Sequence, residues 1–157
     1  MTPADLIHGR ATKEVEMSAM GLFESLPPDV MQFGHGASFQ PKLVQDRLQL
    51  KKVDISRLSS VAVSSVRFDA QMPAAVRDRL EEIGNTMNMV AQIFDGDVER
   101  TVAWFGTRNP MLGDVSPKDM IRLGRYERLR KFIINAMTEQ VANQRAATSP
   151  RARRAQA

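Results

Sequence analysis

The sequence predicts an all-α protein built as a short helical bundle. Three observations support this prediction. Apolar residues recur at helical spacing, capping residues stand where these runs begin, and no segment alternates polar and apolar residues as a half-buried strand does. The chain has 157 residues, 43% of them apolar, which suffices for one compact core but not for two large ones.

The composition argues against several classes of protein. The chain has no cysteine, which removes disulfides, thiol catalysis and thiolate metal sites. No apolar run approaches the roughly 18 residues that cross a bilayer, and no basic segment followed by an apolar run stands at the N-terminus. We therefore expect a cytoplasmic protein with no membrane partner.

The net charge of +4 is unevenly distributed along the chain. Residues 118–157 hold ten Lys and Arg against three Asp and Glu, so the positive charge lies in the C-terminal quarter. Such asymmetry favours an anionic partner, which is a nucleic acid, an acidic protein surface or a phosphate-rich pocket. A merely solubilising basic tail would give the same count.

The first half of the chain divides into two expected parts. Residues 1–38 have poor periodicity and are interpreted as an N-terminal arm. Residues 39–72 carry three short apolar units with tight joints, the pattern of a degenerate helix-turn-helix. Its third unit, around 61–68, is rich in valine and serine, which are weak helix formers.

The second half predicts a longer helical region at 73–142 and a basic tail at 143–157. Pro73 begins a helix to Phe94 with a continuous apolar stripe, which would suit either a monomer core or a dimer seam. Asp97 and Ser116 stand where N-caps of the next two helices belong. A final helix starts near Arg125.

The sequence spacing of the potential catalytic and metal-ligating residues does not predict that they meet in one site. The two histidines, His8 and His35, do not stand at a metal-ligand spacing. Glu81 and Glu82 are adjacent, so on a helix they diverge by about 100° and cannot converge on one atom. The chain also lacks a glycine-rich phosphate-binding motif. We expect a protein that is not an enzyme and that needs no cofactor and no metal.

One long stretch is specific enough to suggest a family. Residues 95–137 read DGDVERTVAWFGTRNPMLGDVSPKDMIRLGRYERLRKFIINAM. In the order and spacing of its helix end, Asn-Pro turn, Ser-Pro start and Gly stop, this stretch resembles the toxin-binding domain of the Xre/MbcA/ParS antitoxin family. In this pattern we expect a structural scaffold made by Trp104, Asn109, Pro110, Leu112, Gly113, Pro117 and Gly124.

The resemblance implies an antitoxin of a type II toxin–antitoxin system. Its implied partner is a toxin with an Arg-Glu-Ser (RES) domain, similar in fold to ADP-ribosyltransferases, which consumes NAD or transfers ADP-ribose. The antitoxin would occlude the active site of that toxin with its basic C-terminal helix or tail. The expected toxin-binding residues are Met111, Arg122, Arg125, Tyr126, Arg128 and Lys131.

Members of this family usually carry a helix-turn-helix upstream, which implies operator DNA as a second partner and autoregulation as a second activity. In this chain the expected reading segment offers only Ser64, Ser65 and Arg67 to the bases. The alternative function is a transcriptional regulator of helix-turn-helix type without a toxin partner. A homodimer within a larger toxin–antitoxin complex is the expected assembly.

Overall fold

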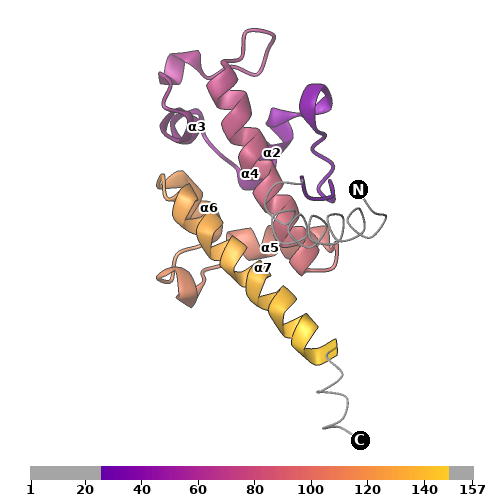
Figure 1. Cartoon of the computed structure of the whole chain (residues 1–157). Coiled ribbons are helices and arrows are strands. Elements are labelled where there is room, and N and C mark those ends of the chain that lie inside the picture. The colour runs from indigo at the N-terminus through magenta and orange to yellow at the C-terminus, as the bar shows by residue number, and fades with distance from the viewer. Residues whose placement is uncertain (1–25, 149–157) are drawn as a thin grey trace, which may run out of the picture.

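A computed structural model describes residues 26–148, and this part of the chain is all-α, as predicted (Figure 1). Its six helices are α2 (Pro41–Leu48), α3 (Lys52–Ser59), α4 (Ala74–Ile93), α5 (Val98–Gly106), α6 (Pro117–Arg122) and α7 (Tyr126–Thr148). Within residues 26–148 there is no strand, and the isolated bridge between Asn109 and Val115 is the one β-type pairing. None of these helices is long and apolar enough to cross a membrane.

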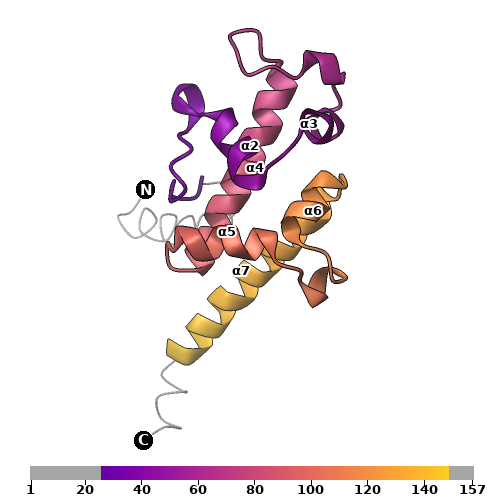
Figure 2. The same cartoon turned by 180° about the vertical axis from the view of Figure 1, so that it is seen from behind.

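Helix α4 is the central element, against which α2, α3, α5 and α7 pack, while α6 packs on α3, α5 and α7 (Figures 1 and 2). Its apolar stripe is buried inside this single chain. The stripe consists of Val76, Leu80, Ile83, Met87 and Val90. The stripe therefore forms the core of the single chain and not a dimer seam. A homodimer would have to use another surface.

Capping residues begin and end the helices much as the sequence predicts. The Asp97 carboxylate accepts a hydrogen bond from the Arg100 amide at 3.0 Å, and the Ser116 hydroxyl accepts one from the Asp119 amide at 3.1 Å. Gly124 has φ +76°, a left-handed conformation that glycine adopts without strain. Pro73, the expected first residue, is the N-cap of α4, so the helix begins one residue later, at Ala74.

The helix-turn-helix prediction is correct for two helices and wrong for the third. Helices α2 and α3 form, but the segment 61–68 contains only the 3-10 turn η2 (Val63–Ser65). Valine and serine have weak helix propensity, and here only Val66 is buried while Val63 is 46% exposed. The segment does not form a helix, because too few of its side chains are buried to offset its weak helix propensity.

The expected N-terminal arm is also corrected, because residues 29–40 belong to the core. Met31, Phe33 and Phe39 are all buried. Phe33 packs where α4 has Gly84: a Cβ atom at Gly84 would lie 3.2 Å from the Phe33 ring and 3.2 Å from a Val44 methyl group. A side chain at this position would crowd both groups, so the segment docks closely on α4 at Gly84. Residues 1–25 of the predicted arm lie outside the described residues.

Polar groups fix this N-terminal segment as well. The Asp29 carboxylate accepts hydrogen bonds from the amides of Phe33 at 2.9 Å and Gly34 at 2.8 Å. Asn88, which is buried in α4, accepts a hydrogen bond from the Met31 amide at 2.8 Å and donates one to Asp29 at 3.3 Å. Burial pushes the pKa of Asp29 upward, but these hydrogen bonds outweigh it and hold the pKa below its ordinary value.

Helix α7 is longer than predicted. The sequence suggested that it ends at residue 142, whereas it continues to Thr148. The added residues include Gln144, Arg145 and two alanines, all good helix formers, and the next helix breaker in the sequence is Pro150. Residues 149–157 of the predicted basic tail lie outside the described residues.

Candidate protein-binding surface

Three of the expected toxin-binding residues lie in solvent on α7 and the turn before it. Arg125, Arg128 and Lys131 are all exposed and follow one another at intervals of three residues. Side chains three positions apart are neighbours on a helix surface. Within residues 26–148, none of the three has a carboxylate within 4.0 Å. We call Arg125, Arg128 and Lys131 the basic face of α7.

Arg122 was expected to extend into solvent, but the structure places it in contacts between helices. Its guanidinium donates to the Gln49 carbonyl oxygen at 2.9 Å and lies 3.6 Å from the Asp54 carboxylate. Asp54 is buried and also accepts a hydrogen bond from the Lys51 amide at 2.8 Å. Arg122 therefore attaches α6 to the turn between α2 and α3, and only 29% of its side chain is exposed.

Tyr126 was expected at the toxin interface and is instead a core residue, only 2% exposed. Its hydroxyl lies 2.7 Å from the Thr86 hydroxyl and donates to the Glu82 carbonyl oxygen at 3.1 Å. Burial raises the pKa of Tyr126 well above its ordinary value. The sequence did not separate Tyr126 from its neighbours because it stands between Arg125 and Glu127, in a locally polar stretch.

Met111 lies in solvent on a well-defined turn and is 78% exposed. The Asn109 side chain accepts a hydrogen bond from the Met111 amide at 2.9 Å, and the Asn109 amide donates to the Val115 carbonyl oxygen at 3.2 Å. Gly113 closes the turn with φ +76°. The turn thus holds an exposed apolar side chain on an ordered backbone, as a contact residue requires.

The remaining scaffold residues are packed to different degrees. Pro117 is buried at the start of α6, whereas Trp104 and Leu112 are only half-buried against the core. Pro110 begins the 3-10 turn η3 (Pro110–Leu112) and is exposed. The Trp104 ring meets the ring of Phe105 edge-on, at 5.2 Å between centroids. Trp104 therefore covers the core instead of filling its centre.

A shallow groove of about 370 Å³ runs along α6 beside the turn that carries Met111. Its walls include Arg108 and Val115 on the turn and Asp119 and Leu123 on or beside α6. Leu123 is 55% exposed, although it is a large apolar residue. Sequence analysis did not identify Leu123 as an exposed residue. Its position between the end of α6 and Gly124 was the one signal that could have indicated exposure.

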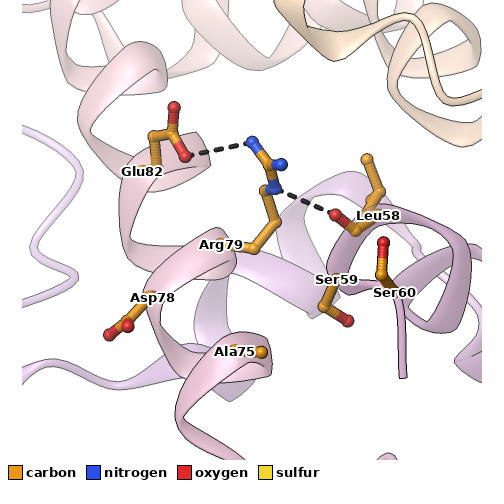
Figure 3. Close-up of a pocket in the computed structure, with 7 residues that line it drawn as sticks. All are labelled: Leu58, Ser59, Ser60, Ala75, Asp78, Arg79 and Glu82. Atoms are coloured by element: carbon orange, nitrogen blue, oxygen red, sulfur yellow. Dashed lines mark hydrogen bonds and ion pairs between the residues drawn. The ribbon is translucent and has the colours of Figure 1, made fainter. Parts of the chain in front are cut away.

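A second pocket, of about 250 Å³, lies between the end of α3 and the start of α4 (Figure 3). Arg79 crosses it and donates to the Leu58 carbonyl oxygen at 2.9 Å and to Glu82 at 3.1 Å. The same guanidinium donates to Glu127 on α7 at 3.0 Å. Arg79 therefore joins α3, α4 and α7, and the pocket is the space around a structural contact.

The expected DNA-binding residues do not form a reading surface. Ser64 and Ser65 belong to the 3-10 turn η2, so no helix presents them to a groove. Arg67 is bound to its neighbours: its guanidinium donates to Asp69 at 2.6 Å and to Gln71 at 2.8 Å. The lowered pKa of Asp69 follows from its hydrogen bonds with Arg67 and the Gln71 amide.

No group of three or more potential metal ligands occurs within residues 26–148. Comparison of the sequence and the structure with known protein families, curated proteins and solved structures found no match. The observed features are thus an ordered helical bundle, an exposed basic face on α7 and an exposed methionine on a rigid turn.

Proposed function

We propose that this chain is an antitoxin that binds a RES-domain toxin and blocks its active site. The observation that carries the proposal is the basic face of α7, where Arg125, Arg128 and Lys131 are exposed and free of carboxylates within residues 26–148. The order and spacing of residues 95–137, which resemble those of the antitoxin family, supply the class of partner.

The basic face suits recognition of carboxylates on a partner. An arginine guanidinium can hold a carboxylate with two parallel hydrogen bonds, and a helix fixes the spacing between successive cations. The face is supported from behind by Leu129 and Ile133, which are buried in the core. Because the side chains stand on a packed helix, binding needs little ordering of the backbone.

Inhibition by this surface would be steric. A toxin that consumes NAD must open a pocket large enough for a dinucleotide, and a rigid helix laid across that opening excludes the substrate. Met111 would add an adaptable apolar contact, since its thioether side chain can pack against varied surfaces. The inhibitor needs no catalytic group of its own, which agrees with the absence of converging acid–base residues in the sequence.

Co-expression tests this function. The test begins with the neighbouring reading frames, where we expect a gene for a RES-type protein. That RES-type protein should arrest growth when it is produced alone, and production of both proteins should restore growth. The two proteins should also copurify. If both proteins accumulate and the arrest persists, the antitoxin function is wrong.

The same preparation separates an inhibitor from a DNA-binding regulator. A regulator that contacts several phosphates loses affinity steeply as the salt concentration rises, whereas a largely apolar protein interface is less sensitive. Tight binding of a duplex without any binding of the toxin would favour the regulator.

A further inference from the structure

A basic and apolar surface lies apart from most of the basic face of α7, where α3 meets the turn between α6 and α7. We call it the α3–α6 corner. Both views place α3 beside this turn (Figures 1 and 2). The corner includes the exposed apolar residues Val53 and Leu123 and the cationic residues Lys51, Lys52, Arg57, Lys118 and Arg122.

Contacts join α3 and the turn before it to α6 and to Gly124. Arg57 on α3 donates a hydrogen bond to the carbonyl oxygen of Arg122, and its side chain lies 3.4 Å from the position of a Cβ atom at Gly124. Lys118 on α6 donates to the Gln49 side chain at 3.1 Å. The hydrogen bonds from the side chains of Arg57 and Arg122 to backbone carbonyl oxygens hold α3 and α6 together in the free protein.

The charges of the corner are unequal. Its five cations are accompanied by Asp54 and Asp119, and Asp114, which lies 4.0 Å from Arg108, lines the groove at Leu123. Asp54 is buried and pairs with Arg122, and Asp119 lies 3.7 Å from the same arginine. Asp54 and Asp119 both lie against Arg122, whereas the side-chain ammonium groups of Lys51 and Lys52 have no carboxylate within 4.0 Å in residues 26–148.

The apolar residues indicate the class of partner. Val53 is 47% exposed and Leu123 is 55% exposed, so the corner presents aliphatic side chains among its cations. A phosphate backbone gains little by covering aliphatic groups, whereas protein interfaces combine apolar contacts with arginine. Arg57 and Arg122 have also already committed donors to backbone carbonyl oxygens, which leaves them fewer for phosphates.

We propose that the α3–α6 corner is a second docking site, which binds an acidic and apolar segment of the toxin. The segment places an aliphatic or aromatic side chain against Val53 and Leu123 and its carboxylates toward Lys51 and Lys52. This inference rests on the proposed antitoxin function and names the chemistry of the partner segment. With two contact areas on one rigid body, the toxin is held at α7 and is also fixed in orientation.

Affinity measurements on the full chain test the corner, and the probe is the purified RES-type protein from the co-expression test. Val53→Asp and Lys52→Glu should each raise the Kd by roughly tenfold or more, as substitutions at important interface residues do. Val63→Asp is the matched control for the valine, since Val63 is 46% exposed on η2. Arg100→Glu, on the exposed N-terminal turn of α5, is the control for the charge. Both controls should bind the toxin as the unchanged chain does.

The outcomes separate the two proposals. If the unchanged chain does not bind the toxin, the antitoxin function fails and the corner fails with it. If the chain binds but both corner variants bind equally well, the corner alone is wrong. If the corner variants keep toxin affinity and instead lose binding to a random-sequence DNA duplex at low salt, the corner is a nucleic-acid surface and the proposal is overturned.

Discussion

The hydroxyl groups of Tyr126 and Thr86 lie 2.7 Å apart inside the bundle and join the start of α7 to the middle of α4. Tyr126 also donates to the Glu82 carbonyl oxygen at 3.1 Å, so its hydroxyl is part of a small buried polar network. On its outer side the Tyr126 ring lies 5.5 Å from the guanidinium of Arg79. This contact fixes the direction in which α7, and therefore its basic face, leaves the core.

Removal of this hydroxyl should weaken the fold without emptying the core. We expect Tyr126→Phe to lower the free energy of unfolding by about 1 kcal/mol, because the aromatic packing remains and the buried hydrogen bonds are lost. Thermal and chemical denaturation measure the change. Thr138→Ala, which removes an exposed hydroxyl of α7, is the control and should change stability by less than about 0.5 kcal/mol. Equal stability of Tyr126→Phe and the unchanged chain would contradict the network.

The same network should give alkaline sensitivity. Burial raises the pKa of Tyr126 above its ordinary value of 10.0, so the folded protein keeps a proton that the unfolded chain releases. Stability from this group is therefore present below about pH 10 and is lost as the pH rises further. The advantage of the unchanged chain over Tyr126→Phe should shrink between about pH 9 and pH 11. A constant difference across this range would show that the phenol ionises freely in the folded state.

Asp29 should show the opposite dependence on pH. Its pKa is lowered in the folded protein, so the stability it provides is present above its ordinary pKa of 3.8 and is lost as the pH falls through the lower folded value. We expect Asp29→Asn to cost about 1–2 kcal/mol at pH 7, because one amide oxygen replaces two charged acceptors. Asp78→Asn, at an exposed position of α4, is the control. If Asp29→Asn is destabilising by the same amount in acid as at pH 7, the Asp29 charge does not provide this stability.

Periodicity and capping residues predicted most of the fold, and the failures have physical causes. The stripe of α4 and the caps Asp97 and Ser116 are local signals, and the structure follows them. The docking of residues 29–40 depends on Gly84, more than forty residues later, and no local pattern reveals that pairing. The missing third helix at 61–68 reflects weak propensity that tertiary burial does not rescue.

The candidate site was predicted by charge, and charge alone cannot tell a free arginine from a bound one. Arg122 and Arg128 look alike in the sequence, yet Arg122 meets Gln49 and Asp54 across the fold while Arg128 lies in solvent. The difference arises because α6 packs on α3, which is a long-range contact. The exposed apolar residues Val53 and Leu123 were missed for the same reason.

These two arginines should respond differently to substitution. We expect Arg122→Ala to reduce the free energy of unfolding by about 1–2 kcal/mol, because it leaves the buried Asp54 without its cation. Arg128→Ala should change stability by less than about 0.5 kcal/mol. Urea denaturation of both variants measures the contrast. Equal losses would show that the contacts of Arg122 contribute no net stability.

Trp104→Ala should be milder than the loss of a central aromatic residue. Full burial of such a ring would make the change cost about 3–5 kcal/mol, but Trp104 is only half-buried. We expect about 2 kcal/mol, part of it from the edge-on contact with Phe105. Chemical denaturation measures this change in the free energy of unfolding. The folded fraction of the variant should bind the toxin as the unchanged chain does. A stable variant that no longer binds would place Trp104 in the interface.

The basic face of α7 should be needed for neutralisation and not for folding. Arg125, Arg128 and Lys131 are exposed, so reversing all three to glutamate should leave most of the stability intact. In co-expression with the RES-type protein, the triple variant should fail to restore growth, because the reversed charges repel the carboxylates that the face is proposed to bind. Arg100→Glu is the control for a reversed charge elsewhere.

The position of the helix end allows this face to be separated from the residues beyond it. Because α7 continues to Thr148, truncation after Thr148 removes residues 149–157 and keeps the whole described helix. If only the triple variant releases toxicity, the helix carries the inhibition. If only the truncated chain does, the basic residues Arg151, Arg153 and Arg154 lie in the segment responsible, and the proposed role of α7 is wrong. Full neutralisation by both variants would leave the basic region as a solubilising surface.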